Sequence, residues 1–182
     1  MNTHSILNIP SSDTSAAPLL VKELSISPVL AQVLVNRGIT SVSEADRFLN
    51  VRLEHLHDPF AFSAMAEAVA LVKHAIERKH RILVHGDYDV DGITSLSLLE
   101  NTLKSMGADV EHHIPHRLKE GYGLHKTIPR RAHDKKINLF ITADCGTNSE
   151  QEILELRRLG MEVLITDHHE QAGSGFASAA SV

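Results

Sequence analysis

Short apolar runs alternate with amphipathic stretches over the second half of the chain. Four near-continuous apolar or β-branched runs are typical of strands whose two faces are both buried. The runs cover residues 82–85, 109–114, 137–142 and 161–166. Helical spacing of apolar residues over 94–106 and 148–159 predicts helices between them. This alternation predicts an α/β fold, a parallel sheet with helices on both faces and right-handed crossovers.

The preceding part of the chain has only the helical pattern. Apolar residues at helical spacing predict three short helices, over 28–36, 43–49 and about 63–81. Gly38 lies just past the end of the first, where helices commonly stop. We therefore expect a helical leader followed by a partial doubly wound parallel sheet.

These patterns divide the chain into four expected segments. Residues 1–18 lack a basic start followed by an apolar stretch, so they predict a disordered polar tail and not a secretory signal. The helical leader takes 19–80 and the α/β domain takes 81–170. In residues 171–182, nine of twelve residues are Ala, Ser or Gly, which predicts a disordered low-complexity end. Because a doubly wound sheet normally continues here, we expect a partial domain.

Composition narrows the class of protein. The 182 residues are 42% hydrophobic, enough for a buried core without a disulfide or metal staple. The single cysteine, Cys145, excludes an internal disulfide framework and fits a cytoplasmic protein. No run of eighteen apolar residues exists, so we expect no membrane span. The net charge of −5 argues against a generally basic surface for nucleic acid, but a local positive groove stays open.

Clusters of acids and histidines follow three of the four predicted strands. In open α/β sheets ligands gather beyond the carboxyl ends of the strands, so all three clusters are expected to meet in one crevice. The first cluster holds His85, Asp87, Asp89 and Asp91, the second holds Asp144, and the third holds Asp167, His168 and His169.

This set of side chains predicts a divalent metal centre. Four or five carboxylates at close range cannot all stay ionised without a counter-charge, and the three clusters contain no Lys or Arg. Oxygen and imidazole donors suit Mn²⁺ or Mg²⁺ better than a structural zinc site. Two such ions about 4 Å apart would activate water for phosphoester hydrolysis.

Each of these acid and histidine motifs also has a purely structural interpretation. Asp91 is placed to cap the helix that follows, and adjacent histidines are more often surface residues than ligands. The pair His112 and His113 lies inside a strand-like run, so we interpret it as structural. Only the joint occurrence of three clusters at three strand exits favours the metal site.

These motifs resemble the DHH phosphoesterases, a family named for its Asp-His-His triplet. The segment 86–92 (Gly-Asp-Tyr-Asp-Val-Asp-Gly), Asp144 with Cys145 and Gly146, and the triplet 167–169 stand in the family's order. The segments 56–60 and 119–124 are similar to the single-strand-specific DNA exonucleases within the family. The likeness runs from Leu19 to Glu170.

The resemblance implies an activity and its requirements. It implies two Mn²⁺ or Mg²⁺ ions and stepwise removal of nucleotides from the 5′ end of single-stranded DNA in recombination and repair. Single-stranded DNA is then the expected partner, and a repair helicase or a single-strand-binding protein is an open one.

Residue roles follow from the same resemblance. His85, Asp87, Asp89 and Asp91 would ligate metal, and which of the three aspartates bind directly stays open. Asp144 would bridge the ions and His168 would complete the second site. His169 would face the scissile phosphate as a donor or an acid, with Asp167 orienting the histidines. The resemblance does not decide whether Arg117 and Lys119 contact phosphate or lie in a solvated loop.

The chain departs from the family pattern after the triplet. The family continues to a further metal-binding aspartate, a second domain and a DNA-binding barrel, which residues 171–182 do not resemble. We therefore expect little exonuclease activity from these 182 residues alone. Two alternatives stay open: a phosphodiesterase for short RNA or cyclic dinucleotides, and an inert remnant that keeps the fold.

Overall fold

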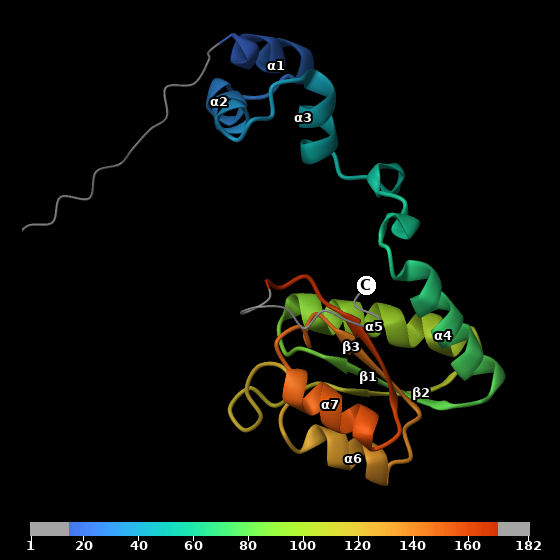
Figure 1. Cartoon of the computed structure of the whole chain (residues 1–182). Coiled ribbons are helices and arrows are strands. Elements are labelled where there is room, and N and C mark those ends of the chain that lie inside the picture. The colour runs from blue at the N-terminus through green and yellow to red at the C-terminus, as the bar shows by residue number, and fades with distance from the viewer. Residues whose placement is uncertain (1–14, 171–182) are drawn as a thin grey trace, which may run out of the picture. The chain divides into compact units, whose positions relative to one another are not determined.

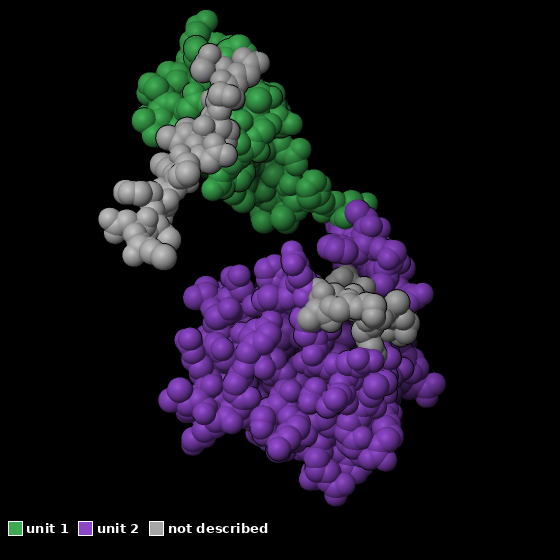
Figure 2. Space-filling view, turned by 60° about the vertical axis from the view of Figure 1, so that its left-hand side comes forward, with its two compact units in different colours: residues 1–58 green, residues 59–182 purple. Residues whose placement is uncertain are grey.

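The structure, a computed structural model, describes residues 15–170, and the chain divides into two compact units, residues 1–58 and 59–182 (Figure 2). The low-complexity end expected at 171–182 and most of the tail expected at 1–18 lie outside the described residues.

The first unit is helical. Its core consists of side chains that are almost completely buried, among them Leu20, Ala31, Leu34 and Ala45. Its elements are α1 (Ala16–Leu24), α2 (Pro28–Asn36), α3 (Val42–Leu49) and the short 3-10 helix η1 (Leu53–His55).

Local capping explains where α2 and α3 begin. The Ser27 hydroxyl accepts a hydrogen bond from Leu30 N at 3.2 Å, and Pro28 needs no N–H in the first turn. The Ser41 hydroxyl accepts from Glu44 N at 3.2 Å and donates to the Glu44 carboxylate at 2.8 Å. The two helices predicted here are therefore confirmed.

Helix α1 corrects the extent of the expected tail. It begins at Ala16, so residues 16–18 are helical, and Ala17 is buried against the other helices. Pro18 stands in the first turn, where its missing N–H breaks no helical bond. Tertiary packing of a short apolar face, which sequence spacing alone did not reveal, stabilises this helix.

The second unit is a four-stranded, all-parallel sheet with helices on both faces (Figure 1). The strand order is β2-β1-β3-β4, so the predicted α/β class is confirmed. Its elements are η2 (Pro59–Ala61), α4 (Met65–Glu77), β1 (Arg81–Gly86), α5 (Val90–Ser105), β2 (Asp109–His113), α6 (Ile128–Asp134), β3 (Leu139–Ala143), α7 (Glu150–Arg158) and β4 (Glu162–Thr166).

Two apolar layers hold the helices to the sheet. On one face, residues of α4 and α5 such as Ala75 and Leu96 pack with Val84 and Ile141. On the other face, residues of α6 and α7 such as Ala132 and Leu156 pack with Phe140 and Val163. Because the strands alternate their side chains between two covered faces, they are apolar throughout.

The strand order creates a switch point between β1 and β3. The chain leaves β1 through α5 to reach β2 on one side, whereas β3 lies on the other side of β1. The connections that leave the carboxyl ends of β1 and β3 therefore diverge, and open α/β sheets commonly bind their ligands at such a point.

Two features of the second unit differ from the predictions. Helix α6 was not predicted, because only Ile128, Pro129 and Ala132 of its seven residues are buried apolar residues. Helix α5 begins at Val90 and not at residue 94, since Asp89 caps it by accepting a hydrogen bond from Gly92 N at 3.0 Å. The interpretation of Asp91 as the cap is therefore wrong.

Within residues 15–170 no single helix has both the length and the apolar character needed to cross a membrane. One bent pair, Leu53–Ala61 with Met65–Glu77, passes the same test by length and composition.

We predict that Gly92→Ala destabilises the second unit. A Cβ at this position would lie 2.5 Å from the backbone nitrogen of Asp87, so the turn between β1 and α5 would have to move. Overpacking of this kind costs about 1–3 kcal/mol, measurable as a lower urea midpoint. The control is Leu98→Ala, at a side chain of α5 that is 70% exposed. Equal midpoints for Gly92→Ala and the wild type would contradict the account of this turn.

Candidate metal centre

Three aspartates lie side by side at one edge of the sheet, each directly after the end of a strand. Gly86 of β1 is in register with Ala143 of β3, and Ala143 is in register with Thr166 of β4. The residue that follows each of these is an aspartate: Asp87, Asp144 and Asp167. The structure thus brings the three predicted clusters to one edge of the sheet.

Asp144 is held in an unusual backbone conformation at this edge. Its φ is 64°, a left-handed value that Asp tolerates better than most residues, and its N–H donates to Thr166 O at 2.9 Å. The side chain is nearly buried, and its Oδ1 lies 3.0 Å from His168 Nε2. Burial, and then the negative charge of Asp89, raise the pKa of Asp144.

Asp167 organises the histidine pair. Its Oδ2 accepts from Thr147 N at 2.9 Å, and its Oδ1 accepts from the backbone N–H groups of His168 and His169 at 2.7 and 3.1 Å. Burial acts to raise the pKa of this carboxyl, but the hydrogen bonds from Thr147 and His169 outweigh it and lower the pKa to about 2. Asp167 is therefore an ionised acceptor at neutral pH.

His169 is oriented by two partners. Its Nδ1 lies 2.7 Å from Asp167 Oδ1 and 3.0 Å from the Tyr122 hydroxyl. The hydrogen bond with Asp167 raises the pKa of His169. Since an ionised carboxylate can only accept, Nδ1 carries the hydrogen, and Nε2 is left for another partner.

Tyr122 was not predicted as a site residue. It comes from the loop between β2 and α6, and its ring meets the His169 ring edge-on with centroids 5.5 Å apart. Burial, and then the Asp167 charge, raise its pKa to about 12, so its hydroxyl keeps its proton. Tyr122 lies between Gly121 and Gly123, which both have a positive φ, but this position in the sequence does not indicate a contact with His169.

The acids after β1 occupy two environments. Asp87 is 1% exposed, its Oδ1 has no hydrogen-bond partner among the described residues, and burial raises its pKa. Asp89, the N-cap of α5, and Asp91, in its first turn, are exposed, and both act to raise the pKa of Asp144. One oxygen of Asp89 also caps the helix. The structure leaves open which of the three would bind a metal directly.

His85 lies beneath this edge, fully buried. Its Nε2 is 3.3 Å from Gly123 O, and its Nδ1 has no partner among the described residues. Burial, and then the neighbouring His113, lower its pKa to about 4. The ring is neutral at physiological pH and offers one unpaired nitrogen.

The two predicted phosphate contacts differ in their surroundings. The Arg117 guanidinium lies 5.2 Å from the centroid of the Tyr88 ring, and its charge acts on the pKa of Asp87, so it stands near the acids. The Lys119 side chain is exposed, and its backbone N–H donates to His116 O at 2.9 Å in a turn.

The residues present fit a divalent cation. Asp144, His168 and His169 each offer a ligand atom within 4.8 Å of the others. The unpaired oxygen of Asp87 and the unpaired nitrogen of His85 are further donors. Mixed carboxylate and imidazole donors match the preference of Mn²⁺ and related ions. His169 belongs to this geometric group although the resemblance placed it toward the phosphate.

Comparison with models of known protein families identifies a family for the second unit. The model of the "DHH family, N-terminal domain" matches residues 81–181.

Several of the similar curated proteins are RecJ exonucleases. The single-stranded-DNA-specific exonuclease RecJ of Bacillus subtilis is 38% identical over 158 residues, which cover 87% of this chain and 20% of that protein. The RecJ protein of Thermus thermophilus is 45% identical over 65% of this chain, and the match covers 18% of that protein. The RecJ protein of Escherichia coli is 32% identical over 79% of this chain, and the match covers 24% of that protein. The chain therefore spans about a fifth of the length of these relatives.

Similar solved structures have the same name. A crystal structure of RecJ from Thermus thermophilus in complex with Mn²⁺ matches 92% of this chain and 23% of that one, with a TM-score of 0.64 and 30% identity. A structure of exonuclease RecJ bound to manganese matches 59% of this chain and 28% of that one, with a TM-score of 0.55 and 45% identity.

We predict that Asp167→Asn lowers the pKa of His169 toward the ordinary value of 6.5. The substitution removes the charge that stabilises the imidazolium, so the ring loses its proton at lower pH. An NMR titration of the ring protons measures this. Asp134→Asn, which removes a carboxylate paired with Arg130 and His133 elsewhere, is the control. An unchanged His169 pKa in Asp167→Asn would contradict the assigned hydrogen bond.

Proposed function

The chain belongs to the DHH family, and we propose that it carries the metal centre of a 5′→3′ exonuclease that hydrolyses phosphodiester bonds of single-stranded DNA in recombination and repair. The observation that carries the proposal is the pair of Asp144 and His168 at the strand edge, 3.0 Å apart, with His169 next to them and the unpaired atoms of Asp87 and His85 as further donors.

The proposed cofactors are two Mn²⁺ or Mg²⁺ ions. Both solved relatives described above are complexes with manganese, and the donors of this chain fit such an ion. In the proposed arrangement Asp144 and His168 would hold one ion. Asp144 would also help to hold the other, together with His85 of β1 and the acids that follow this strand, Asp87, Asp89 and Asp91. When bound, the ions would supply an activated water and neutralise charge on the scissile phosphate.

His169 is proposed as the group that meets the scissile phosphate. Its Nδ1–H is engaged by Asp167, so the Nε2–H of the imidazolium is free to donate to a phosphate oxygen or to protonate the leaving oxygen. Asp167 acts through this bond: it fixes the ring and stabilises its charge. The raised pKa of His169 keeps a larger fraction of the ring protonated near neutral pH.

Arg117 is proposed as a contact to the DNA backbone. Its guanidinium is held over the Tyr88 ring and close to the acids, where it would pair with a phosphate next to the scissile one. Lys119, exposed in the same loop, would add a weaker and more mobile contact. A repair helicase or a single-strand-binding protein is the proposed kind of protein partner, and the cytoplasm the proposed compartment.

A degradation assay with Mn²⁺ tests the proposal. The substrates are single-stranded DNA with the label at its 3′ end, the same strand in a duplex, and a dinucleotide. We expect a longer protein that contains the chain to shorten single-stranded DNA from the 5′ end and to stop when EDTA removes the metal, and we expect the 182 residues alone to show little activity. Preference for the dinucleotide would instead identify a phosphodiesterase of short substrates.

We predict that Asp144→Asn abolishes this activity, a loss of at least about 100-fold, because the bridging charge is removed. Its matched control is Asp134→Asn, a surface aspartate of α6, which should retain activity. Mn²⁺ binding, measured by the loss of the free-ion EPR signal, should fall with activity in Asp144→Asn only. Full activity in Asp144→Asn would contradict the role of this residue.

A further inference from the structure

We infer that Glu120 and Arg131 are positioning residues for His85: their ion pair holds the loop after β2 so that one carbonyl of the loop fixes which His85 nitrogen keeps a lone pair for a metal. The inference rests on the proposed function, because it deepens the role of His85. Neither Glu120 nor Arg131 belongs to the three clusters.

The first step concerns the two nitrogens of His85. Nε2 lies 3.3 Å from Gly123 O, and a carbonyl oxygen can only accept, so the ring hydrogen is on Nε2. Nδ1 then carries the lone pair, and it is buried with no partner among the described residues. A histidine that binds a metal commonly donates its other N–H to a carbonyl, which fixes the tautomer.

The second step concerns the position of Gly123. Its φ is +76°, and an added Cβ would lie 3.3 Å from Ser149 Oγ. The next residue is tied to the same side chain, because Leu124 N donates to Ser149 Oγ at 3.4 Å. This end of the loop is therefore fixed to the start of α7.

The other part of the loop is fixed by Glu120. Its side chain is 16% exposed; Oε2 accepts from His116 N at 2.8 Å and Oε1 accepts from Arg131 Nη1 at 2.7 Å. The carboxylate thus closes the turn of the loop and ties it to α6. A mostly buried carboxylate without its arginine would draw in water or move, and the loop would move with it.

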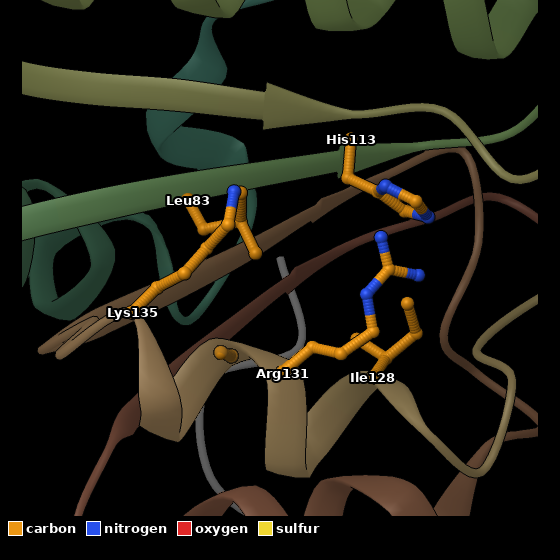
Figure 3. Close-up of a pocket in the computed structure, with 6 residues that line it drawn as sticks. Leu83, His113, Ile128, Arg131 and Lys135 are labelled. Atoms are coloured by element: carbon orange, nitrogen blue, oxygen red, sulfur yellow. The ribbon is translucent and has the colours of Figure 1, made fainter.

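The third step connects this pair with the His85 ring. His113 Nε2 lies 3.5 Å from Glu120 Oε1, and the His113 ring lies against the His85 ring with centroids 5.2 Å apart. Phe140 stacks on His85 with centroids 5.8 Å apart. Figure 3 shows the Arg131 guanidinium directed at His113. His85 is therefore held between Phe140 and a group that Glu120 and Arg131 keep in place.

The same loop reaches the opposite side of the centre. Tyr122 precedes Gly123 and its hydroxyl meets His169. The loop that this ion pair holds thus makes one contact with His85 of β1 and another with His169 after β4. This connection gives the pair an effect on metal binding although it lies outside the metal-binding cluster.

The test compares two neighbouring arginines of α6. Arg131→Gln removes the partner of Glu120, and Arg130→Gln, its matched control, removes an exposed pair with Asp134. The first readout is two-bond ¹H–¹⁵N NMR of the metal-free chain, which reports the His85 tautomer. The second is Mn²⁺ affinity by EPR. Glu120→Gln and Arg131→Lys complete the set.

We predict that the wild type and Arg130→Gln have His85 in the Nε2–H tautomer. Arg131→Gln and Glu120→Gln should show a mixture of tautomers and about 10-fold weaker Mn²⁺ binding, in the range known for partners of metal ligands. Arg131→Lys keeps a cation near Glu120 and should recover most of that affinity. Far-UV circular dichroism checks that each variant is folded.

An unchanged tautomer together with Mn²⁺ affinity within twofold of the wild type in folded Arg131→Gln would overturn the positioning role. Equal losses in Arg130→Gln and Arg131→Gln would overturn it too, since the effect would then be a general one of charge. A wild-type chain that has the Nε2–H tautomer but binds no Mn²⁺ would overturn the proposed function, while the tautomers of the variants would still test the positioning role.

Discussion

The register of three parallel strands, β1, β3 and β4, is the constraint on which the candidate metal centre depends. Gly86, Ala143 and Thr166 are in register across β1, β3 and β4. The next residue after each of them is an aspartate, so three carboxylates lie at the same edge of the sheet. The apolar layers on both faces determine this register, because a slip by one residue would turn buried side chains toward the wrong face. Packing far from the edge thus places the carboxylates.

Such an arrangement concentrates negative charge that the protein neutralises only in part. Asp167 receives hydrogen bonds and remains ionised, whereas Asp87 and Asp144 are buried and their pKa values are raised. His169, whose pKa is raised by Asp167, supplies positive charge within the clusters. A bound cation would relieve the remaining repulsion and satisfy the orphan atoms of Asp87 and His85, so the same unfavourable features indicate a binding site.

The parts that could be predicted from the sequence are those with a local signal. The strands follow from apolar runs, and the three clusters follow from their position at strand exits. Helix α6 has too few apolar positions for a pattern, and α1 depends on packing against its neighbours. Tyr122 meets His169 across 47 residues, and Glu120 meets Arg131 across 11. Contacts of this kind depend on tertiary structure, so no sequence spacing reveals them.

The most direct test of the central claim is an anomalous difference map from crystals grown with Mn²⁺. The account predicts two peaks about 4 Å apart at the carboxyl ends of β1, β3 and β4, with Asp144 in contact with both. Peaks elsewhere on the molecule, or none at this edge at millimolar Mn²⁺, would contradict the claim that the aligned strands of this chain build a metal centre.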